Sequence, residues 1–133
     1  MIGTNNFGDD SAEDIAAGIA AVVEKLRARL PQSKVLLLGV FPRGIRSNDP
    51  LRTKMASVNN RIKNLADRKT IYYLDINDKL LRPDGSQDRE LMPDLVHLSP
   101  KGYAIWADAI EPKVAELLEG TVPSPNLPKQ AGP

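Results

Sequence analysis

The chain has 133 residues, with 18 Lys or Arg against 17 Asp or Glu, and its formal net charge is +1. This length predicts one domain with a sizeable core. Acids and bases are interspersed, which argues against the basic stripe of a nucleic-acid-binding protein and the polybasic patch of a membrane-surface protein. The absence of cysteine excludes disulfides, thiolate nucleophiles and thiolate metal sites. No apolar run is long enough to cross a bilayer. No signal peptide is visible, which bears on the compartment only if Met1 is the true start.

The first feature is the segment Gly3-Thr4-Asn5-Asn6, which follows only two residues. A glycine and two amides favour a turn at the end of a strand. A side-chain amide in that position can donate an N–H into a crevice, as oxyanion-hole residues do. Asn5 is therefore a candidate oxyanion donor, and an Asn in an ordinary turn is the alternative.

A helix is predicted from Ser11 to Leu30. Ser11 followed by Asp14 resembles a capping box, and Pro31 ends the helix. Its apolar residues define one inner face: Ile15, Ile19, Val22, Val23, Leu26 and Leu30. The continuously apolar run 34–40 then predicts a strand that is buried on both faces, as in a parallel sheet.

A second helix is predicted from about Leu51 to Asp67, and its inner face is Leu51, Met55, Val58, Ile62 and Leu65. Residues 70–76, "TIYYLDI", predict a second strand because they are rich in β-branched and aromatic side chains. An irregular stretch follows, with a turn at residues 83–85.

The last helix is predicted to begin with Ser99 as its N-cap and Pro100 as its first residue. Its predicted inner face is Tyr103, Trp106, Ile110, Val114, Leu117 and Leu118. Residues 120–133 are Pro-rich with little apolar bulk, and we expect a disordered tail there. The domain is therefore placed at residues 1–119.

Alternating helices and strands in this order predict a doubly wound α/β sheet. Ligands in such sheets bind beyond the carboxyl ends of the strands. Three segments leave those ends here: residues 3–10, residues 41–50 and the stretch that ends at His97. We expect all three to meet at one edge of the domain.

His97 is the only histidine, and Asp94 lies three residues before it. In a tight turn this spacing allows the carboxylate to accept the Nδ1 proton, fix the tautomer and stabilise the imidazolium. The Nε2 atom is then free to act as a general base. A surface histidine before a helix has the same pattern and is the alternative. One histidine with scattered carboxylates offers too few ligands for a metal site, and no cofactor is indicated.

Taken together, these segments resemble the SGNH, or GDSL, hydrolase family. "GTNN" and "DLVHLSPKGYAIWADAI" look like the third and fifth conserved blocks. "VLLLGVFPRG" with "NDPLRTKMASVNNRI" is similar to the catalytic subunits of intracellular platelet-activating-factor acetylhydrolase and their bacterial esterase relatives. The resemblance covers about residues 1–119. It implies a flavodoxin-like, three-layer α/β/α fold with a five-stranded parallel sheet. It also implies a serine esterase or acyl hydrolase that needs no metal.

The resemblance also implies roles for individual residues. His97 would be the general base, Asp94 its orienting acid and Asn5 the oxyanion donor. Gly3 would let the strand turn sharply before Asn5. Arg43 lies in the loop that borders the crevice and is a candidate substrate-side residue, with a solvated loop charge as the alternative.

The family's nucleophilic serine, in a Gly-Asp-Ser block, has no counterpart here, and neither does the glycine of the second block. None of the seven serines follows a strand in a suitable elbow. Residues 84–86 spell Asp-Gly-Ser but are typical of a surface turn, and Ser99 is better explained as a helix cap. We therefore expect that the chain alone does not hydrolyse esters by the family mechanism.

Three interpretations follow. The chain is the carboxyl-terminal portion of an esterase whose amino-terminal strands are missing, with residues 1–2 as the end of the third strand. Alternatively, it completes its sheet with a partner that supplies strands and serine, or as a homo-oligomer, because an open edge invites pairing. Third, it is a non-catalytic relative. The expected substrate is a small-molecule ester with an acetyl-like acyl group on a lipid, sugar or alcohol. The sequence leaves the choice among these, and the compartment, open.

Overall fold

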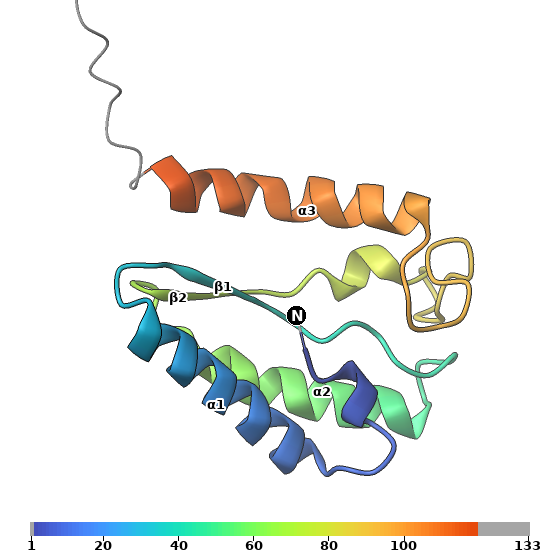
Figure 1. Ribbon diagram of the computed structural model, residues 1–133. Coiled ribbons are helices and arrows are strands. Elements are labelled where there is room, and N and C mark those ends of the chain that lie inside the picture. Colours follow the sequence, from blue (N-terminus) through green and yellow to red (C-terminus); the bar gives the residue numbers. More distant parts are fainter. Residues whose placement is uncertain (1, 120–133) are drawn as a thin grey trace, which may run out of the picture.

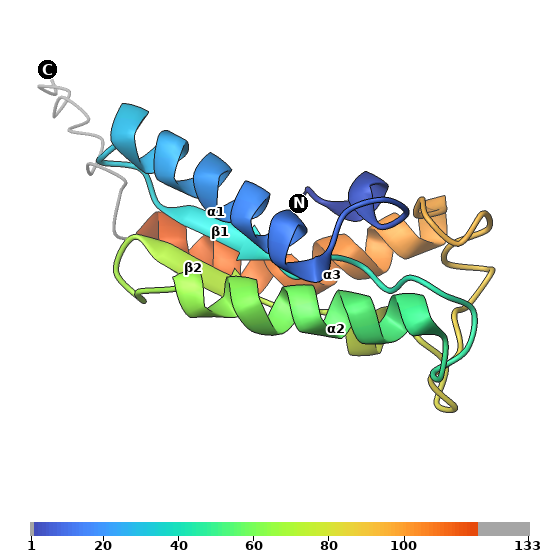
Figure 2. The ribbon, with the colours of Figure 1, turned by 90° about the horizontal axis from the view of Figure 1, so that it is seen from below.

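The computed structural model describes residues 2–119 and contains three layers, two of helices and one of strands. Helices α1 (Ala12–Arg29) and α2 (Pro50–Ile62) cover one face of a small sheet, and α3 (Pro100–Glu119) covers the other (Figures 1 and 2). The predicted Pro-rich tail lies outside the described residues. The layered α/β arrangement agrees with the sequence prediction.

The sheet has two parallel strands, β1 (Val35–Leu38) and β2 (Ile71–Leu74). Val35 pairs with Ile71, and the register continues to Leu38 opposite Leu74. Both strands were predicted, and both are shorter than the segments predicted for them, residues 34–40 and 70–76. A parallel pair needs a crossover between its strands, and α2 supplies it.

Helix α1 begins where the sequence predicts. The Ser11 side chain accepts a hydrogen bond from the N–H of Asp14 at 3.1 Å. At the other end, the Arg27 guanidinium donates to the carbonyls of Pro31 and Ser33. These carbonyls follow the last turn, where a basic side chain is favoured.

Helix α2 is shorter than predicted. It starts at Pro50, capped by Asp49, and ends at Ile62, followed by the 3₁₀ turn Lys63–Leu65. The helix does not continue to Asp67, because that carboxylate accepts hydrogen bonds from the backbone N–H groups of residues 69, 70 and 71. These bonds form the turn into β2 and hold the pKa of Asp67 well below its ordinary value.

Two apolar clusters form the core, one on each side of the sheet. The cluster under α1 and α2 contains Phe7, Ile15, Ile19, Val23, Leu37, Val40, Met55, Val58 and Ile62. The cluster on the α3 side contains Phe41, Ile76, Leu80, Leu91 and Met92. The inner face predicted for α2 is correct, because its residues are buried or packed against the first cluster.

The inner faces predicted for α1 and α3 are too wide. On α1, Val22, Leu26 and Leu30 are exposed. On α3, the exposed apolar residues are Tyr103, Val114 and Leu118. The physical reason is the width of the sheet: within residues 2–119 only β2 pairs with β1. The outer part of each helix face therefore has no strand to pack on.

Two hollows lie beside the helices that flank β1, a strand with one unpaired edge within residues 2–119. One of about 380 Å³ lies between β1 and α3 and is lined by Leu36, Val114, Leu117 and Leu118 with residues 32–34. Another, of about 230 Å³, lies between the N-terminal segment and α1. None of the described helices is long and apolar enough to cross a membrane.

Candidate active site

The chain leaving β1 is held by buried amides. The Asn59 side chain accepts from the N–H of Val40 at 2.8 Å and donates to its carbonyl at 3.0 Å. Asn77 donates to the same carbonyl at 2.9 Å. These bonds satisfy the backbone of Val40, just beyond the strand end. Sequence reasoning missed both residues, because a lone Asn in a helix or after a strand gives no distinctive signal.

The loop after β1 is fixed by Arg52 of α2. Its guanidinium donates to the carbonyls of Arg43, Gly44 and Gly85 at 3.2, 2.9 and 3.1 Å. Partial burial lowers the pKa of Arg52, and the nearby Asp49 carboxylate opposes that effect. Gly44 has φ 84, and a Cβ there would lie 2.4 Å from the Asp49 Cγ. The close packing of the loop therefore requires glycine at this position.

Arg43 itself was predicted to lie on the substrate side. Its side chain is half-buried, and its Nε has no hydrogen-bond partner within residues 2–119. It does not line the cavity beside His97. The structure therefore does not bring Arg43 together with the other candidates, and its role stays a prediction.

Asp94 and His97 form a closed turn. The His97 Nδ1 lies 2.6 Å from the Asp94 Oδ2, and the other carboxylate oxygen accepts from the N–H groups of Val96 and His97 at 2.9 and 2.7 Å. The bond from the imidazole and those from the two backbone groups hold the pKa of Asp94 well below its ordinary value. The carboxyl group is therefore ionised at neutral pH, as an orienting acid must be. The imidazole side chain is 78% exposed, which leaves Nε2 accessible.

Ser99 anchors this turn to α3. Its hydroxyl accepts from the N–H of Gly102 at 3.1 Å and donates to the carbonyl of Glu90 at 2.6 Å. It is thus engaged as a helix cap, as predicted. Ser86 is bound by Asp84 through both its N–H and its hydroxyl, in a turn where Gly85 has φ 77. Neither serine hydroxyl is bonded to His97.

The N-terminal segment forms the 3₁₀ turn Thr4–Asn6. Gly3 precedes it with φ 103, and a Cβ there would lie 3.1 Å from side-chain atoms of Ile15 and Ile19. The Asn6 amide donates to Asp10 at 2.7 Å. Asn5 is exposed, and no hydrogen bond to its side chain is found within the described residues.

A cavity of about 190 Å³ is lined by residues from all three of the segments that were expected to meet. It is lined by Thr4, Leu38, Phe41, Val96, His97, Leu98, Tyr103 and Trp106. The N-terminal turn, the end of β1 and the His97 turn therefore meet at one edge of the domain. Asn5 is adjacent in sequence to Thr4 but does not line this cavity.

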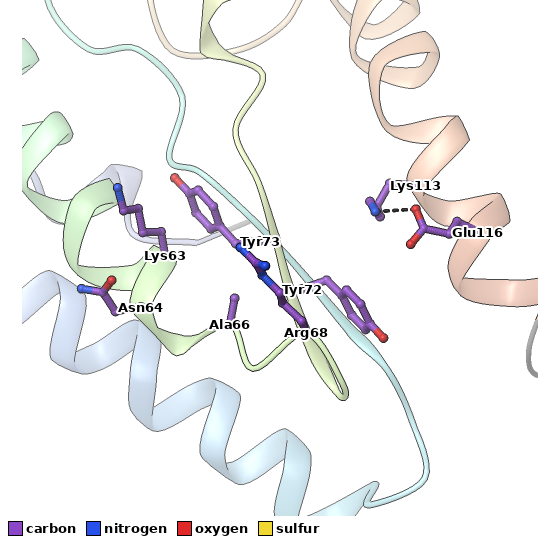
Figure 3. Close-up of a pocket in the computed structure, with 8 residues that line it drawn as sticks. All are labelled: Lys63, Asn64, Ala66, Arg68, Tyr72, Tyr73, Lys113 and Glu116. Atoms are coloured by element: carbon purple, nitrogen blue, oxygen red, sulfur yellow. Dashed lines mark hydrogen bonds and ion pairs between the residues drawn. The ribbon is translucent and has the colours of Figure 1, made fainter.

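A larger hollow, of about 610 Å³, lies elsewhere, at the outer edge of β2 (Figure 3). Lys63 and Arg68 border it beside the tyrosines of β2, and Lys113 of α3 is ion-paired with Glu116 across from them. The hydroxyl of Tyr73 donates to Asp75, and its pKa is raised by burial and by that carboxylate. These side chains include no histidine and no serine. Chemistry rather than size therefore places the candidate site beside His97.

No group of three or more His, Asp or Glu side chains in the described part of the chain is arranged to hold a metal ion. The groups gathered at the candidate site are an imidazole, its carboxylate partner and backbone turns. They fit acid–base chemistry.

The layered arrangement of helices about a parallel sheet is the fold of the SGNH, or GDSL, hydrolases. The chain belongs to the GDSL-like lipase/acylhydrolase family, whose sequence model matches residues 1–105. The family is one of hydrolases, and the resemblance drawn from the sequence is confirmed.

Curated relatives include the platelet-activating factor acetylhydrolase IB subunit alpha2 of Rattus norvegicus. It is 38% identical over 121 residues, which are 90% of this chain and 52% of the relative. The alpha1 subunit of Homo sapiens is 36% identical over 118 residues, 88% of this chain and 50% of that protein. The chain thus spans about half the length of the curated relatives that it matches.

Solved structures confirm the fold. A GDSL-like lipase from Bacteroides thetaiotaomicron matches with a TM-score of 0.69 at 23% identity, over 86% of this chain and 59% of that one. A carbohydrate esterase family 3 protein from Talaromyces cellulolyticus matches with a TM-score of 0.64 at 22% identity, over 92% and 58%. At such identities the match concerns the fold alone.

Proposed function

We propose that this chain supplies the base, the orienting acid and one oxyanion donor of a serine esterase that acts on small acyl esters. The observation that carries the proposal is the 2.6 Å contact between the His97 Nδ1 and the Asp94 Oδ2. It occurs in the segment that resembles the fifth block of the family, and it leaves Nε2 exposed.

The chemistry follows from this geometry. Asp94 accepts a hydrogen bond from Nδ1–H, so the Nε2 lone pair can remove the proton of a serine hydroxyl as that oxygen attacks the ester carbonyl. The imidazolium then returns this proton to the departing alkoxide. A water molecule, activated by the same nitrogen, hydrolyses the acyl-serine. The Asn5 amide stabilises the oxyanion in both steps.

The nucleophile is expected from outside the described residues, because neither Ser86 nor Ser99 is bonded to His97. Its source is a Gly-Asp-Ser block, either earlier in the same polypeptide or in a partner chain. Within residues 2–119, β1 has one unpaired edge, and α1 and α3 carry exposed apolar residues; both features support this completion of the sheet.

The acyl group is expected to be small and acetyl-like. The cavity beside His97 has a volume of about 190 Å³, and apolar side chains such as Phe41, Val96 and Leu98 line it. The curated relatives are named acetylhydrolases, which favours the same acyl size. The alcohol half, whether lipid, sugar or simple alcohol, stays open.

The test has two steps. The first is to determine the coding sequence before Met1 and the proteins that co-purify with the chain, looking for a strand followed by Gly-Asp-Ser. The second is to measure p-nitrophenyl acetate hydrolysis by the chain alone and by the chain with that segment. We expect hydrolysis only with the segment, and its loss in His97→Ala. Hydrolysis that persists in His97→Ala would contradict the proposal.

The open edge also favours a second candidate, a non-catalytic module that completes its sheet by association with another chain or a second copy. It predicts a stable complex in light scattering, with no labelling by a fluorophosphonate probe of serine hydrolases. Labelling of the complex at a serine would exclude this candidate.

A further inference from the structure

Gln87 is a buried polar residue that bridges two segments of the candidate site. Gln87 is only 4% exposed. The side-chain Nε2 donates to the carbonyl of Pro42, after β1, at 2.8 Å and to that of Leu95, in the His97 turn, at 3.2 Å. Its backbone N–H donates to the carbonyl of Ile45 at 2.9 Å. One residue thus contacts both the loop after β1 and the turn that presents His97.

The orientation of the Gln87 amide follows from its surroundings. The groups at its nitrogen end are two carbonyls and the sulfur of Met92, all of them acceptors. Only an NH₂ group can satisfy them. The Oε1 atom is buried without a hydrogen-bond partner within residues 2–119. Burying Oε1 without a donor costs free energy, and the two hydrogen bonds donated by Nε2 offset that cost.

The bond from Gln87 reaches a residue with an unfavourable backbone conformation. Leu95 has φ 65, and the left-handed region is disfavoured for a residue with a branched side chain. It lies between Asp94 and His97, so its conformation sets how the carboxylate faces the imidazole. The Gln87 amide acts on the carbonyl of that same residue.

We propose that Gln87 is a positioning residue, which holds the Leu95 backbone so that the Asp94 carboxylate faces the Nδ1 of His97. The same side chain fixes this turn to the loop after β1. It touches neither the imidazole nor the carboxylate and acts through Leu95. The proposal rests on the role proposed for His97. Its test uses no ester, so a failure of hydrolysis and a failure of this proposal are distinguishable.

The test uses nuclear magnetic resonance on the full ¹⁵N-labelled chain, because its one histidine gives an unambiguous imidazole spectrum. In the wild type we expect the neutral imidazole to carry its proton on Nδ1. In Gln87→Met, which keeps the volume but removes both donors, we expect signals of interchanging tautomers. We also expect hydrogen exchange at the amides of Val96 and His97 to become about tenfold faster, the factor that corresponds to the cost of a left-handed residue.

A matched control is Asn77→Leu. Asn77 is another buried amide, and it donates to the carbonyl of Val40 but makes no hydrogen bond to residues 94–97. We expect it to lower the free energy of unfolding without changing the imidazole spectrum. If Asn77→Leu changes that spectrum as much as Gln87→Met does, the effect is one of general stability and the proposal is wrong.

A rescue variant makes the test sharper. Glycine adopts φ 65 without strain, so Leu95→Gly in the Gln87→Met background should restore the Nδ1–H tautomer. This double variant, and Gln87→Glu, which lacks the donors at neutral pH, also serve if Gln87→Met does not fold. An unchanged imidazole spectrum in Gln87→Met or Gln87→Glu would overturn the proposal. So would a double variant whose imidazole tautomers interchange as they do in Gln87→Met.

Discussion

The turn that carries His97 differs in its contacts from the N-terminal corner, residues 3–6, which carries Asn5. Asp94 accepts three hydrogen bonds from groups no more than three residues away, so the turn closes on itself. The Asn5 side chain, in contrast, is exposed, and no bond to it is found in the described part of the chain. The contacts that orient His97 therefore form within one short turn, whereas no contact in the described part of the chain orients the Asn5 side chain.

The largest expected effect comes from removing the base. His97→Ala in the complemented, ester-hydrolysing protein should lower kcat by at least about 10³-fold, because proton transfer to and from serine is lost. Steady-state hydrolysis of p-nitrophenyl acetate measures it. A kcat within tenfold of the wild type would show that the turn is not part of the catalytic site.

The second prediction concerns Phe7, the core residue that anchors the N-terminal corner. Phe7 directly follows the 3₁₀ turn Thr4–Asn6 and is buried in the cluster under α1 and α2. Phe7→Ala should lower the free energy of unfolding by about 3 kcal/mol, because a large core side chain is replaced by a cavity. Urea unfolding measures this loss.

The exposed Leu26 of α1 is the matched control for Phe7. Leu26→Ala should cost at most about 0.5 kcal/mol in the chain alone, since an exposed site has little to lose. Equal losses in the two variants would mean that the corner is not anchored by the core.

The third prediction separates chemistry from stability at the corner itself. Asn5→Ala should lower kcat in the complemented protein by about 10²-fold, the usual effect of removing one oxyanion donor. Its free energy of unfolding should change by less than about 0.5 kcal/mol. A variant that is destabilised but catalytically normal would favour an ordinary turn residue.

The smallest effect is the acid dependence of the His97 turn. The pKa of Asp94 is lowered in the folded chain, so its contribution to stability is present above the unfolded value of about 3.9. That contribution declines as the pH falls from there through the folded value. The difference in unfolding free energy between wild type and Asp94→Asn should therefore shrink below about pH 4.

Asp67 provides a comparison for this acid effect, since its pKa is lowered by a similar set of backbone bonds but without a histidine. Asp67→Asn should show the same sign. A difference for Asp94→Asn that grows on acidification would contradict the assigned hydrogen bonds.

Much of the fold could be predicted from the sequence because its signals are local. Ser11 and Pro31 bound α1, and Ser99 with Pro100 begins α3, as capping chemistry requires. The first strand follows from a continuously apolar run, and the second follows from a segment rich in β-branched and aromatic residues. The end of α2 could not be predicted, because the turn at Asp67 arises from four hydrogen bonds that compete with the helix.

The site was predictable only where sequence neighbours form it. Asp94 and His97 are three residues apart, and their spacing suggested the contact that the structure contains. Arg52 and Gln87 hold carbonyls as many as 45 residues away, and such contacts have no sequence pattern. The functional roles of His97, Asp94, Asn5, Gly3 and Arg43 remain predictions. The exposed faces of α1 and α3 show the same limit, since periodicity marks an apolar face but not the width of the sheet it covers.

The open edge of β1 makes concentration a variable in any stability measurement. A segment that binds this edge only in the folded state stabilises the chain by mass action, and each tenfold rise in its free concentration above Kd adds about 1.4 kcal/mol. A covalently attached segment would act at a fixed, high local concentration, whereas a separate chain would be diluted away. Melting temperature measured across a dilution series can therefore show whether a separate chain binds this edge.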